Sequence, residues 1–526
     1  MSHNKPPEAR ARASVHRPSL TVNALSNWTS IAVHMAVGFL LTPVIIQSVG
    51  KTGYGIWTIV HSFVGYYGLL NLGVRSAIMR YVARDAARGD VKALNETVDT
   101  AAVVFLITGT VAALLSFILA RPLTAFFDIS DEYRRIFIVV VWVLGISTAV
   151  EFLSSVLAAI LSAYEKYVAI NIVNVLSYLG RAVLIVIALR SGGGVAELAY
   201  ATLAMAAAIL ISKFIICRRG IPDIGLSLRR ARWSTLKMLL GYGLATIVMN
   251  VVNMMRTRLD SVVIGRWVDI EAVAVYGVAA QIIQYFYSLV NTGVGVVTPR
   301  FARLDGTQRH QEMRRLFRRS LYVGGLLAFG GGMMAAVFGR AFIALWVGDG
   351  FQAAVPVLWV LLASYTLGLA QSSGYGLMLA RDRHRVFARI MVIEAMANVA
   401  LSIVLAPRLG ILGVALGTAI PMLVVKLLVQ PIYVCRVARV SLREYVAPLA
   451  VPAFVAAVMT GALMGSGVLP LLDRLSIPAF LGAGAVIGAL YVVVVYLTTR
   501  TRSFAPDFGK TIRSLRPAAP GTAGDP

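Results

Sequence analysis

Long apolar runs recur along this chain and restrict the folds open to it. Each run covers about 20 to 30 residues, and a helix that rises 1.5 Å per residue over that length crosses the roughly 30 Å hydrocarbon core of a bilayer. Hydrophobic residues make up 58% of the chain and charged residues only 14%. The runs lack the alternation of period two that a membrane barrel requires. The sequence therefore predicts an all-α, polytopic membrane protein.

The boundaries of the apolar runs predict fourteen transmembrane helices. The first run is too long for the core of a signal peptide, so we expect the N-terminal segment to be retained. The predicted spans are 24–48, 53–79, 98–120, 136–162, 167–189, 195–215, 238–265, 272–298, 320–345, 353–380, 386–406, 411–435, 446–468 and 476–498.

The distribution of Lys and Arg predicts the orientation of these spans. Of the 49 basic residues, 35 fall in alternate segments on the side of the N-terminus, nine fall on the opposite side and five fall within spans. Because short cytosolic loops are enriched in Lys and Arg, both termini are expected in the cytosol. The same pattern accounts for the net charge of +25 without a nucleic-acid partner, and anionic membrane lipids are the expected contacts of the basic segments.

Three pairs of short motifs indicate an internal duplication. "GVRSAIMRYVARD" and "GVGVVTPRFARLD", "IICRR" and "YVCRV", and "ARPLTAF" and "GRAFIAL" are each separated by about 220 residues, and three near-equal separations suggest a duplicated six-span unit, as in one class of transporters. Two six-helix lobes of the same orientation follow, with the last two spans outside the repeat. The predicted organisation is a basic leader at 1–22, a first lobe at 23–218, a cytosolic linker at 219–237, a second lobe at 238–436, a two-helix hairpin at 437–498 and a cytosolic tail at 499–526.

Once residues near the ends of the spans are counted with the adjacent loops, eight ionisable residues remain inside predicted spans, where charges are costly and often functional. Such residues usually face a water-filled cavity or pair with one another. Their basic excess predicts a mildly cationic cavity that favours an anionic ligand. The eight are Arg75, Arg181, Arg256, Arg258, Lys426, Glu151, Asp260 and Glu394.

The charges of the seventh span have two interpretations. Arg256 and Asp260 are spaced i,i+4, so they share a helix face and can neutralise each other. Their predicted place near the outer interface would let Arg256 and Arg258 either line an outward vestibule or anchor the helix at the interface. Arg75 lies near the cytosolic end of its span, and its counterpart in the repeat is Gly295, so the duplicated scaffold does not require an arginine there.

The remaining charges suggest pairs. Glu151 with Arg181, and Glu394 with Lys426, lie too deep in their spans to reach an interface easily and can form structural ion pairs instead. Their alternative role is to line the cavity.

Histidine and cysteine offer little chemistry in this chain. His34 and His61 lie in predicted spans, where they could titrate in a coupling cycle or serve as hydrogen-bonded packing residues. Cys217 and Cys435 fall at predicted cytosolic helix ends, where a reducing environment disfavours a disulfide.

Enzymatic motifs are missing from the sequence. "GKT" at residues 50–52 resembles part of a phosphate-binding loop, but the glycine required five positions earlier is Ile45. The sequence contains no H-E-x-x-H, no C-x-x-C and no nucleophile elbow, and its loops are short. We therefore expect no enzymatic activity, no cofactor and no metal centre.

Two stretches resemble a known family. "RTRLDSVVIGRWVDIEAVAVYGVAAQIIQ", followed by "TPRFARLDG", is similar to the start of the second half of the polysaccharide-transporter (Wzx-type) flippases. These belong to the multidrug/oligosaccharidyl-lipid/polysaccharide exporter superfamily. "VGKTGYGIWTIVHSFVGYYGLLNLGVRSAIMRYVAR" resembles the corresponding start of the first half. The resemblance covers residues 20–440 and consists of glycines, aromatic residues and helix-end arginines in order.

This resemblance implies two lobes around a central cavity and alternating access without ATP hydrolysis. The implied activity is export of an isoprenoid-pyrophosphate-linked oligosaccharide across the bacterial cytoplasmic membrane for surface polysaccharide synthesis, such as that of O-antigen or exopolysaccharide. A polysaccharide polymerase and glycosyltransferases are implied as partners. The cavity cations Arg75, Arg256, Arg258, Arg181 and Lys426 would contact the head group, and Asp260, Glu151, Glu394, His34 and His61 would orient them or couple transport to an ion.

Two other functions remain open from the sequence. An ion-coupled drug antiporter of the same superfamily would need an acid deep in the first lobe, for which Glu151 is the candidate. A membrane scaffold that organises glycosyltransferases would instead use the basic cytosolic loops.

Overall fold

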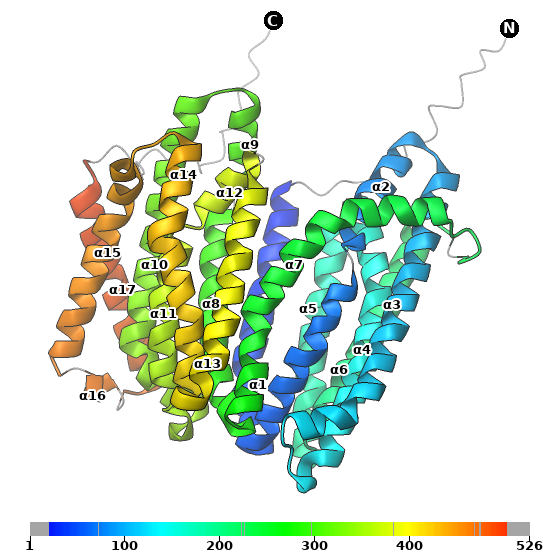
Figure 1. The fold of residues 1–526 in the computed structure, drawn as a ribbon, viewed down its shortest axis with the longest axis horizontal. Coiled ribbons are helices and arrows are strands. Elements are labelled where there is room, and N and C mark those ends of the chain that lie inside the picture. Colours follow the sequence, from blue (N-terminus) through cyan, green and yellow to red (C-terminus); the bar gives the residue numbers. More distant parts are fainter. Residues whose placement is uncertain are drawn as a thin grey trace, which may run out of the picture. The chain divides into compact units, whose positions relative to one another are not determined.

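The computed structural model describes residues 20–501 except 72, 222–223, 226, 296, 382, 468 and 473–474. Side chains at 20–21, 24, 242–250, 252–253, 256–257, 384–385 and 469 also lie outside the description. The described residues form helices joined by short turns and contain no strand (Figure 1). The predicted all-α architecture is confirmed.

The chain divides into two compact units, Met1–Val251 and Val252–Pro526, which we describe separately. The division falls inside one helix, α7 (Trp233–Trp267), whereas the sequence predicts a second lobe from residue 238. The predicted domain ranges remain predictions. The other helices of the first unit are α1 (Leu20–Gly65), the 3₁₀ helix η2 (Tyr66–Asn71), α2 (Val74–Arg88), α3 (Val91–Phe126), α4 (Asp131–Ala163), α5 (Tyr167–Arg190) and α6 (Val195–Gly220).

The second unit begins within α7 and continues through shorter and longer helices. Its elements are α8 (Ile270–Gly295), α9 (Thr298–Gly306), α10 (His310–Val347), the 3₁₀ helix η3 (Asp349–Phe351), α11 (Ala354–Ala370), α12 (Ser373–Ala380), α13 (His384–Val424), the π-helical turn η4 (Val425–Val429), α14 (Gln430–Ala438), α15 (Leu442–Gly465), α16 (Leu469–Leu472) and α17 (Ile477–Thr499).

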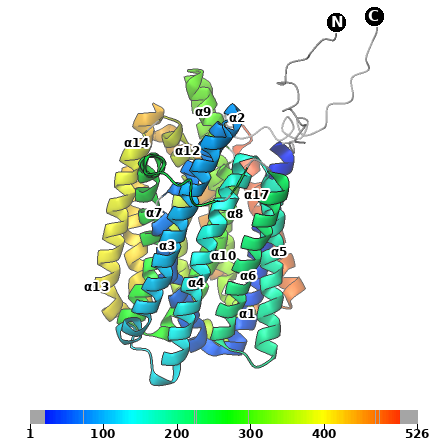
Figure 2. The ribbon, with the colours of Figure 1, turned by 90° about the vertical axis from the view of Figure 1, so that its right-hand side faces the viewer.

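Helix α4 packs between α3 and α6 in the first unit, and α3 and α4 run side by side in Figure 2. A Cβ atom at Gly109 of α3 would lie 3.1 Å from the Ala149 backbone of α4, so the glycine lets the two backbones approach. Small residues serve the same purpose in membrane helices generally. Phe105 and Phe152 fill the rest of this contact as an edge-to-face pair with ring centroids 5.9 Å apart.

Helix α10 is the centre of the second unit and contacts α11, α15 and α17 (Figure 1). A Cβ atom at Gly330 would lie 2.6 Å from the ring of Tyr491 on α17, so only glycine fits beneath that ring. The hydroxyls of Tyr322 on α10 and Thr499 on α17 share a hydrogen bond of 2.7 Å in the buried interior. The two C-terminal helices are therefore integral parts of this unit.

Two long helices contain sharp breaks at glycine. Gly50 in α1 has φ of 72°, and Gly410 in α13 has φ of 59°, a left-handed conformation that glycine adopts without a Cβ clash. Both glycines fall where the sequence predicts a turn between two spans. Among the described residues ten helices are long and apolar enough to span a membrane, or eleven if α11 and α12, bent by 42°, form one broken span. The count of fourteen remains a prediction.

The break at Gly410 allows the two halves of α13 to pack against each other through Gly417. A Cβ atom there would lie 2.7 Å from the Ser402 Cα atom and 2.6 Å from its backbone nitrogen. We predict that Gly417→Ala lowers the free energy of unfolding by about 1–3 kcal/mol, because backbone atoms must move apart. Gly461→Ala in α15, where nothing lies within 4 Å of the added Cβ, is the matched control. Equal unfolding curves in detergent for the two variants would contradict the prediction.

Candidate functional site

Four charged side chains from four helices form a cluster in the first unit. Arg75 comes from α2, Glu151 from α4, Arg181 from α5 and Lys213 from α6. Lys213 interacts electrostatically with Arg75, which repels it, and with Glu151, which attracts it. Glu151 also attracts Arg181. Two cations, Arg181 and Lys213, therefore act on the Glu151 carboxylate, and Arg75 acts on Lys213. We call these four residues the first-unit cation cluster.

Lys213 is the member that sequence analysis missed. It lies near the end of the predicted span 195–215 and is counted there with the basic residues of the following cytosolic segment, so the sequence does not suggest it as a cavity residue. The structure places it inside α6 with only 8% of the residue exposed, and the apolar residues 214–217, "FIIC", continue the helix beyond it. The Lys213 ammonium donates a hydrogen bond of 3.2 Å to the Ser154 hydroxyl. Among the described residues this neutral hydroxyl is its one hydrogen-bond partner, and an ammonium has three donors, so the buried cation has capacity for an anion.

The other members of the cluster are more open. Arg75 and Glu151 are exposed and Arg181 is half-buried, so the protein does not close over them. Arg181 and Lys213 both act electrostatically on Glu151, and the ion pair of Glu151 with Arg181 stays a prediction. With three cations and one carboxylate, the cluster carries a net positive charge.

The two predicted histidines take part in ring contacts in the first unit. The His34 ring lies 4.7 Å from the Tyr178 ring, and Arg181 acts electrostatically on both side chains. His34 therefore lies at the edge of the cation cluster. His61 packs edge-on against Trp57 with centroids 5.2 Å apart.

Asp260 occupies a buried polar site in the second unit, with 8% of the residue exposed. Its carboxylate accepts hydrogen bonds from the Tyr276 hydroxyl of α8 and from the Thr418 hydroxyl of α13, the latter at 3.2 and 3.3 Å. Thr418 in turn accepts a hydrogen bond of 2.9 Å from the Asn398 amide. Hydroxyl oxygens from α8 and α13 therefore lie around one buried carboxylate of α7.

Further oxygens complete this site. The Ser402 hydroxyl lies 3.5 Å from the Asn398 amide oxygen and 3.4 Å from the Val414 carbonyl oxygen. Carboxylate, hydroxyl, amide and carbonyl oxygens suit a proton or a hard cation. No group of three or more His, Cys, Asp or Glu side chains that could hold a metal ion occurs in the described part of the chain.

The arginines near Asp260 are only partly described. The side chain of Arg256 lies outside the described residues, so its predicted pairing with Asp260 stays a prediction. Arg258 is half-buried on the same helix, α7. The hydroxyl partners of Asp260 lie on α8 and α13, far along the chain, and local spacing gave no signal for them.

Lys426 and Glu394 approach each other in the interior of the second unit, as the sequence predicts. The ammonium lies 3.8 Å from the Glu394 carboxylate, and both residues are less than 8% exposed. Lys426 also donates a hydrogen bond of 2.8 Å to the Gln430 amide oxygen and lies 5.7 Å from the centre of the Phe387 ring. These contacts hold the cation within the protein.

The same lysine lies beside the break between α11 and α12. The Gln371 amide at that break donates to the Lys426 carbonyl oxygen at 3.1 Å, which the π-helical turn η4 presents. Such turns inside helices often mark functional sites. The buried hydroxyl of Tyr445 on α15 donates to the Gln371 side chain at 2.8 Å. The polar groups at the broken helix are therefore bound by two neighbouring helices.

The two cysteines are free and buried, in accord with the prediction. Cys217 lies near the end of α6, and Cys435 lies in α14.

Comparison with known proteins identifies one family and one fold. The family model described as "Polysaccharide biosynthesis protein" matches residues 49–356. A Shigella flexneri protein that is assigned as an O-antigen transporter is 21% identical over 420 residues, which cover 79% of this chain and 98% of that protein. These matches accord with the resemblance found in the sequence.

Two solved structures share the fold. The lipid II flippase MurJ, in an inward closed conformation, superposes with a TM-score of 0.71 at 13% identity and covers 91% of this chain and 99% of its own. An inward-facing multidrug resistance transporter of the MATE family, from the MOP superfamily, superposes with a TM-score of 0.62 at 16% identity. The superposition covers 82% of this chain and 99% of the transporter. At these identities the likeness concerns the fold alone.

The Lys426–Glu394 pair generates a stability prediction. Lys426→Met leaves a buried carboxylate without its cation, and breaking a buried pair in this way costs about 3–5 kcal/mol. We expect the double variant Lys426→Met/Glu394→Gln to recover part of that loss, because neither charge is then stranded. The measurement is chemical unfolding in detergent of both single variants and the double variant.

The exposed pair Arg309 and Glu312, 3.4 Å apart on α10, provides the control. Glu312→Gln should change the unfolding free energy by less than about 1 kcal/mol. Strictly additive effects at Lys426 and Glu394 would show that the two side chains do not stabilise each other.

Proposed function

We propose that this chain, which belongs to the polysaccharide biosynthesis protein family, is a flippase that exports a lipid-linked oligosaccharide across the bacterial cytoplasmic membrane. The observation that carries the proposal is the first-unit cation cluster, where Arg75, Arg181 and Lys213 lie among helices that otherwise present apolar side chains. The family match and the Shigella relative support a role in surface polysaccharide synthesis. The MurJ-like fold supports a transporter of lipid-linked cargo.

The chemistry of the cluster suits a pyrophosphate. Guanidinium groups contact phosphate oxygens with two parallel hydrogen bonds, and an ammonium acts as a compact point charge. The low dielectric of a helical bundle strengthens both interactions relative to water. A cargo of isoprenoid pyrophosphate and oligosaccharide would place its anion among the three cations and its lipid tail in the bilayer.

Transport proceeds in this proposal by alternating access. The loaded site opens first to the cytosol and then to the far side, with both termini cytosolic and no ATP hydrolysis. Arg256 and Arg258 of α7 would hold the head group from the second unit. Asp260, whose carboxylate accepts hydrogen bonds from two hydroxyls, would bind a proton or Na⁺ and so couple the cycle to an ion gradient.

The drug-antiporter alternative fits the first unit less well. A cationic drug requires an available carboxylate, and the candidate Glu151 is already attracted by Arg181 and Lys213. An additional cation there would meet net repulsion.

Translocation in proteoliposomes tests the proposal. Purified protein is reconstituted with an undecaprenyl-pyrophosphate oligosaccharide, and a glycosidase added outside reports how much substrate becomes accessible. Protein-dependent movement is expected, with no movement of a dye cation under the same gradients. Dye movement without glycolipid movement would favour the antiporter, and movement of neither would favour the scaffold.

Removal of a cluster cation should slow translocation. We predict that Lys213→Gln and Arg181→Gln each reduce the initial rate at least about tenfold, a loss of about 1.4 kcal/mol of head-group interaction. Arg75→Ala, Arg256→Ala and Arg258→Ala are expected to abolish export. Arg134→Gln, which removes an exposed arginine paired with the exposed Asp131, should leave the rate unchanged. Normal rates for the cluster variants at normal membrane levels would contradict this head-group site.

Asp260 should control the dependence on an ion gradient. Asp260→Asn retains an oxygen that accepts from Tyr276 and Thr418 but removes the negative charge, so we predict a translocation rate that no longer responds to an imposed proton or Na⁺ gradient. Asp269→Asn, at an exposed position before α8, is the control and should keep the response. A gradient response that survives in Asp260→Asn would exclude this carboxylate as the coupling group.

A further inference from the structure

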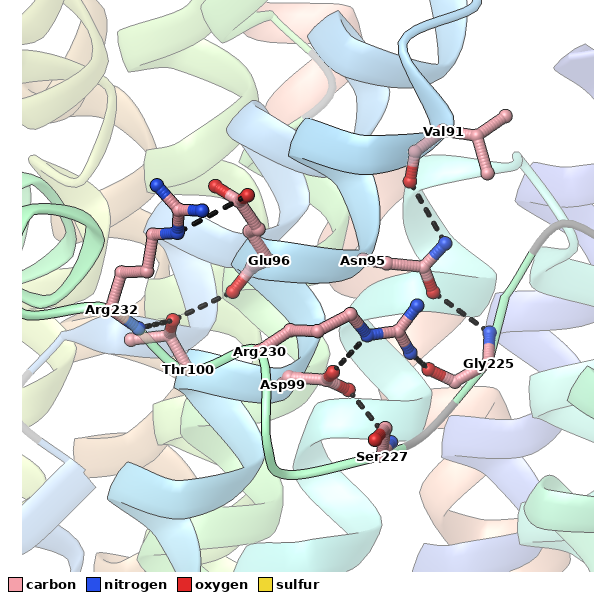
Figure 3. Close-up of polar contacts among 9 residues, drawn as sticks. All are labelled: Val91, Asn95, Glu96, Asp99, Thr100, Gly225, Ser227, Arg230 and Arg232. Atoms are coloured by element: carbon pink, nitrogen blue, oxygen red, sulfur yellow. Dashed lines mark hydrogen bonds and ion pairs between the residues drawn. The ribbon is translucent and has the colours of Figure 1, made fainter.

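The segment that joins α6 to α7, residues 221–232, lies along the first turns of α3 at its described positions, which exclude 222–223 and 226 (Figure 3). We call this segment the connector. The sequence predicts it only as part of a basic cytosolic linker, yet it is attached to the first unit at several points. Two of these attachment points are the apolar side chains of Ile221 and Ile224, which are buried at 2% and 4% exposure.

The strongest polar attachment is Asp99 of α3, whose side chain is fully buried. One carboxylate oxygen accepts a hydrogen bond of 2.7 Å from the Arg230 guanidinium, and the other accepts a hydrogen bond of 3.1 Å from the Ser227 backbone amide (Figure 3). The same guanidinium donates to the Gly225 carbonyl oxygen. One buried anion therefore fixes two turns of the connector.

Side chains on the adjacent turns of α3 satisfy further connector amides. The Asn95 side-chain oxygen accepts from the Gly225 amide at 2.8 Å, and the Thr100 hydroxyl accepts from the Arg232 amide at 3.1 Å. The Arg232 guanidinium lies 3.3 Å from the Glu96 carboxylate. All these contacts are visible in Figure 3.

The spacing of these residues explains why they act together. Asn95 and Asp99 are four residues apart, and so are Glu96 and Thr100, so they form two neighbouring rows on one side of α3. Together the two rows present four polar side chains to the connector. Without them, the backbone amides of the connector would need water molecules as hydrogen-bond partners. The contacts with Asp99 are charge-assisted, and a buried carboxylate stripped of them would be unpaired. Separation of the connector from α3 is therefore strongly disfavoured.

We infer that Asp99 is a positioning residue that makes the connector a fixed part of the first unit throughout transport. Any change in position between the two units is then taken up beyond Arg232, within α7, which is the helix where the chain passes from one unit to the other. The inference rests on the proposed function for its transport consequence, but the attachment itself can be measured without transport.

Amide hydrogen exchange tests the attachment. The amides of Gly225, Ser227 and Arg232 should be protected in the reconstituted protein, both with and without an undecaprenyl-pyrophosphate glycolipid. Asp99→Asn should speed their exchange at least tenfold, while Arg230→Lys, which keeps a cation beside Asp99, should preserve most of the protection. Asp131→Asn, which breaks an exposed ion pair of the same unit, is the control. Unchanged protection in Asp99→Asn, or protection lost whenever glycolipid is added, would overturn the inference.

A reversible covalent bond tests the transport consequence. A Cβ atom at Gly225 would lie 3.9 Å from the Asn95 side-chain oxygen, so the pair Asn95→Cys/Gly225→Cys is close enough to test for a disulfide, whose formation is verified by mass before transport is measured. The oxidised protein should translocate glycolipid within twofold of the reduced protein, because the bond restrains a segment that does not move. Activity that is present when reduced and lost when oxidised would show that the connector must leave α3, and would overturn the inference.

The two proposals fail in different ways. If the wild-type protein translocates no glycolipid, the proposed function is wrong, while the exchange measurement still decides whether Asp99 holds the connector.

Discussion

An ionised side chain removed from water must find charged or hydrogen-bonding partners within the protein, because the desolvation penalty otherwise destabilises the fold. This constraint gives the buried charges of the chain distinct roles. Asp99 is enclosed by a guanidinium and a backbone amide and serves as an attachment point for the connector. Lys426, beside Glu394 and Gln430, stabilises the break between α11 and α12.

Lys213 differs from those residues in the balance of its surroundings. Its one described hydrogen bond is to a neutral hydroxyl, and the nearby charges are a repelling arginine and a carboxylate that also attracts Arg181. A buried ammonium in that setting gains from an additional anion. The excess of positive charge around Lys213 lowers the stability of the protein without ligand. It also favours binding of an anionic head group in the first unit.

Much of the fold follows from the sequence, because the length and apolarity of a membrane helix are local properties. The turns predicted near Gly50 and Gly410 coincide with the backbone breaks at those glycines, and the Glu394–Lys426 pair was found from the depth of the two residues in their spans. In the sequence Lys213 is counted with the cytosolic basic residues because a cluster of such residues follows it, although it lies in the last turns of α6.

The polar sites could be predicted only in part, because their partners come from distant segments. The carboxylate of Asp260 is hydrogen-bonded by Thr418, 158 residues along the chain, and Asp99 is held by Arg230, 131 residues away. No periodicity within a helix encodes such pairs. The sequence identified Asp260 as a functional candidate by its cost in a membrane, but it gave no indication of Asp99, which lies at the edge of a predicted span.

The most direct test of the central claim, that buried cations in the first unit recognise an anionic head group, is a binding measurement. Native mass spectrometry of the detergent-solubilised protein in an equimolar mixture of undecaprenyl pyrophosphate and uncharged undecaprenol would report the preference between lipids of identical tail. The account predicts selective retention of the pyrophosphate, and loss of that selectivity in Lys213→Gln. Equal binding of the two lipids by the wild-type protein would contradict it.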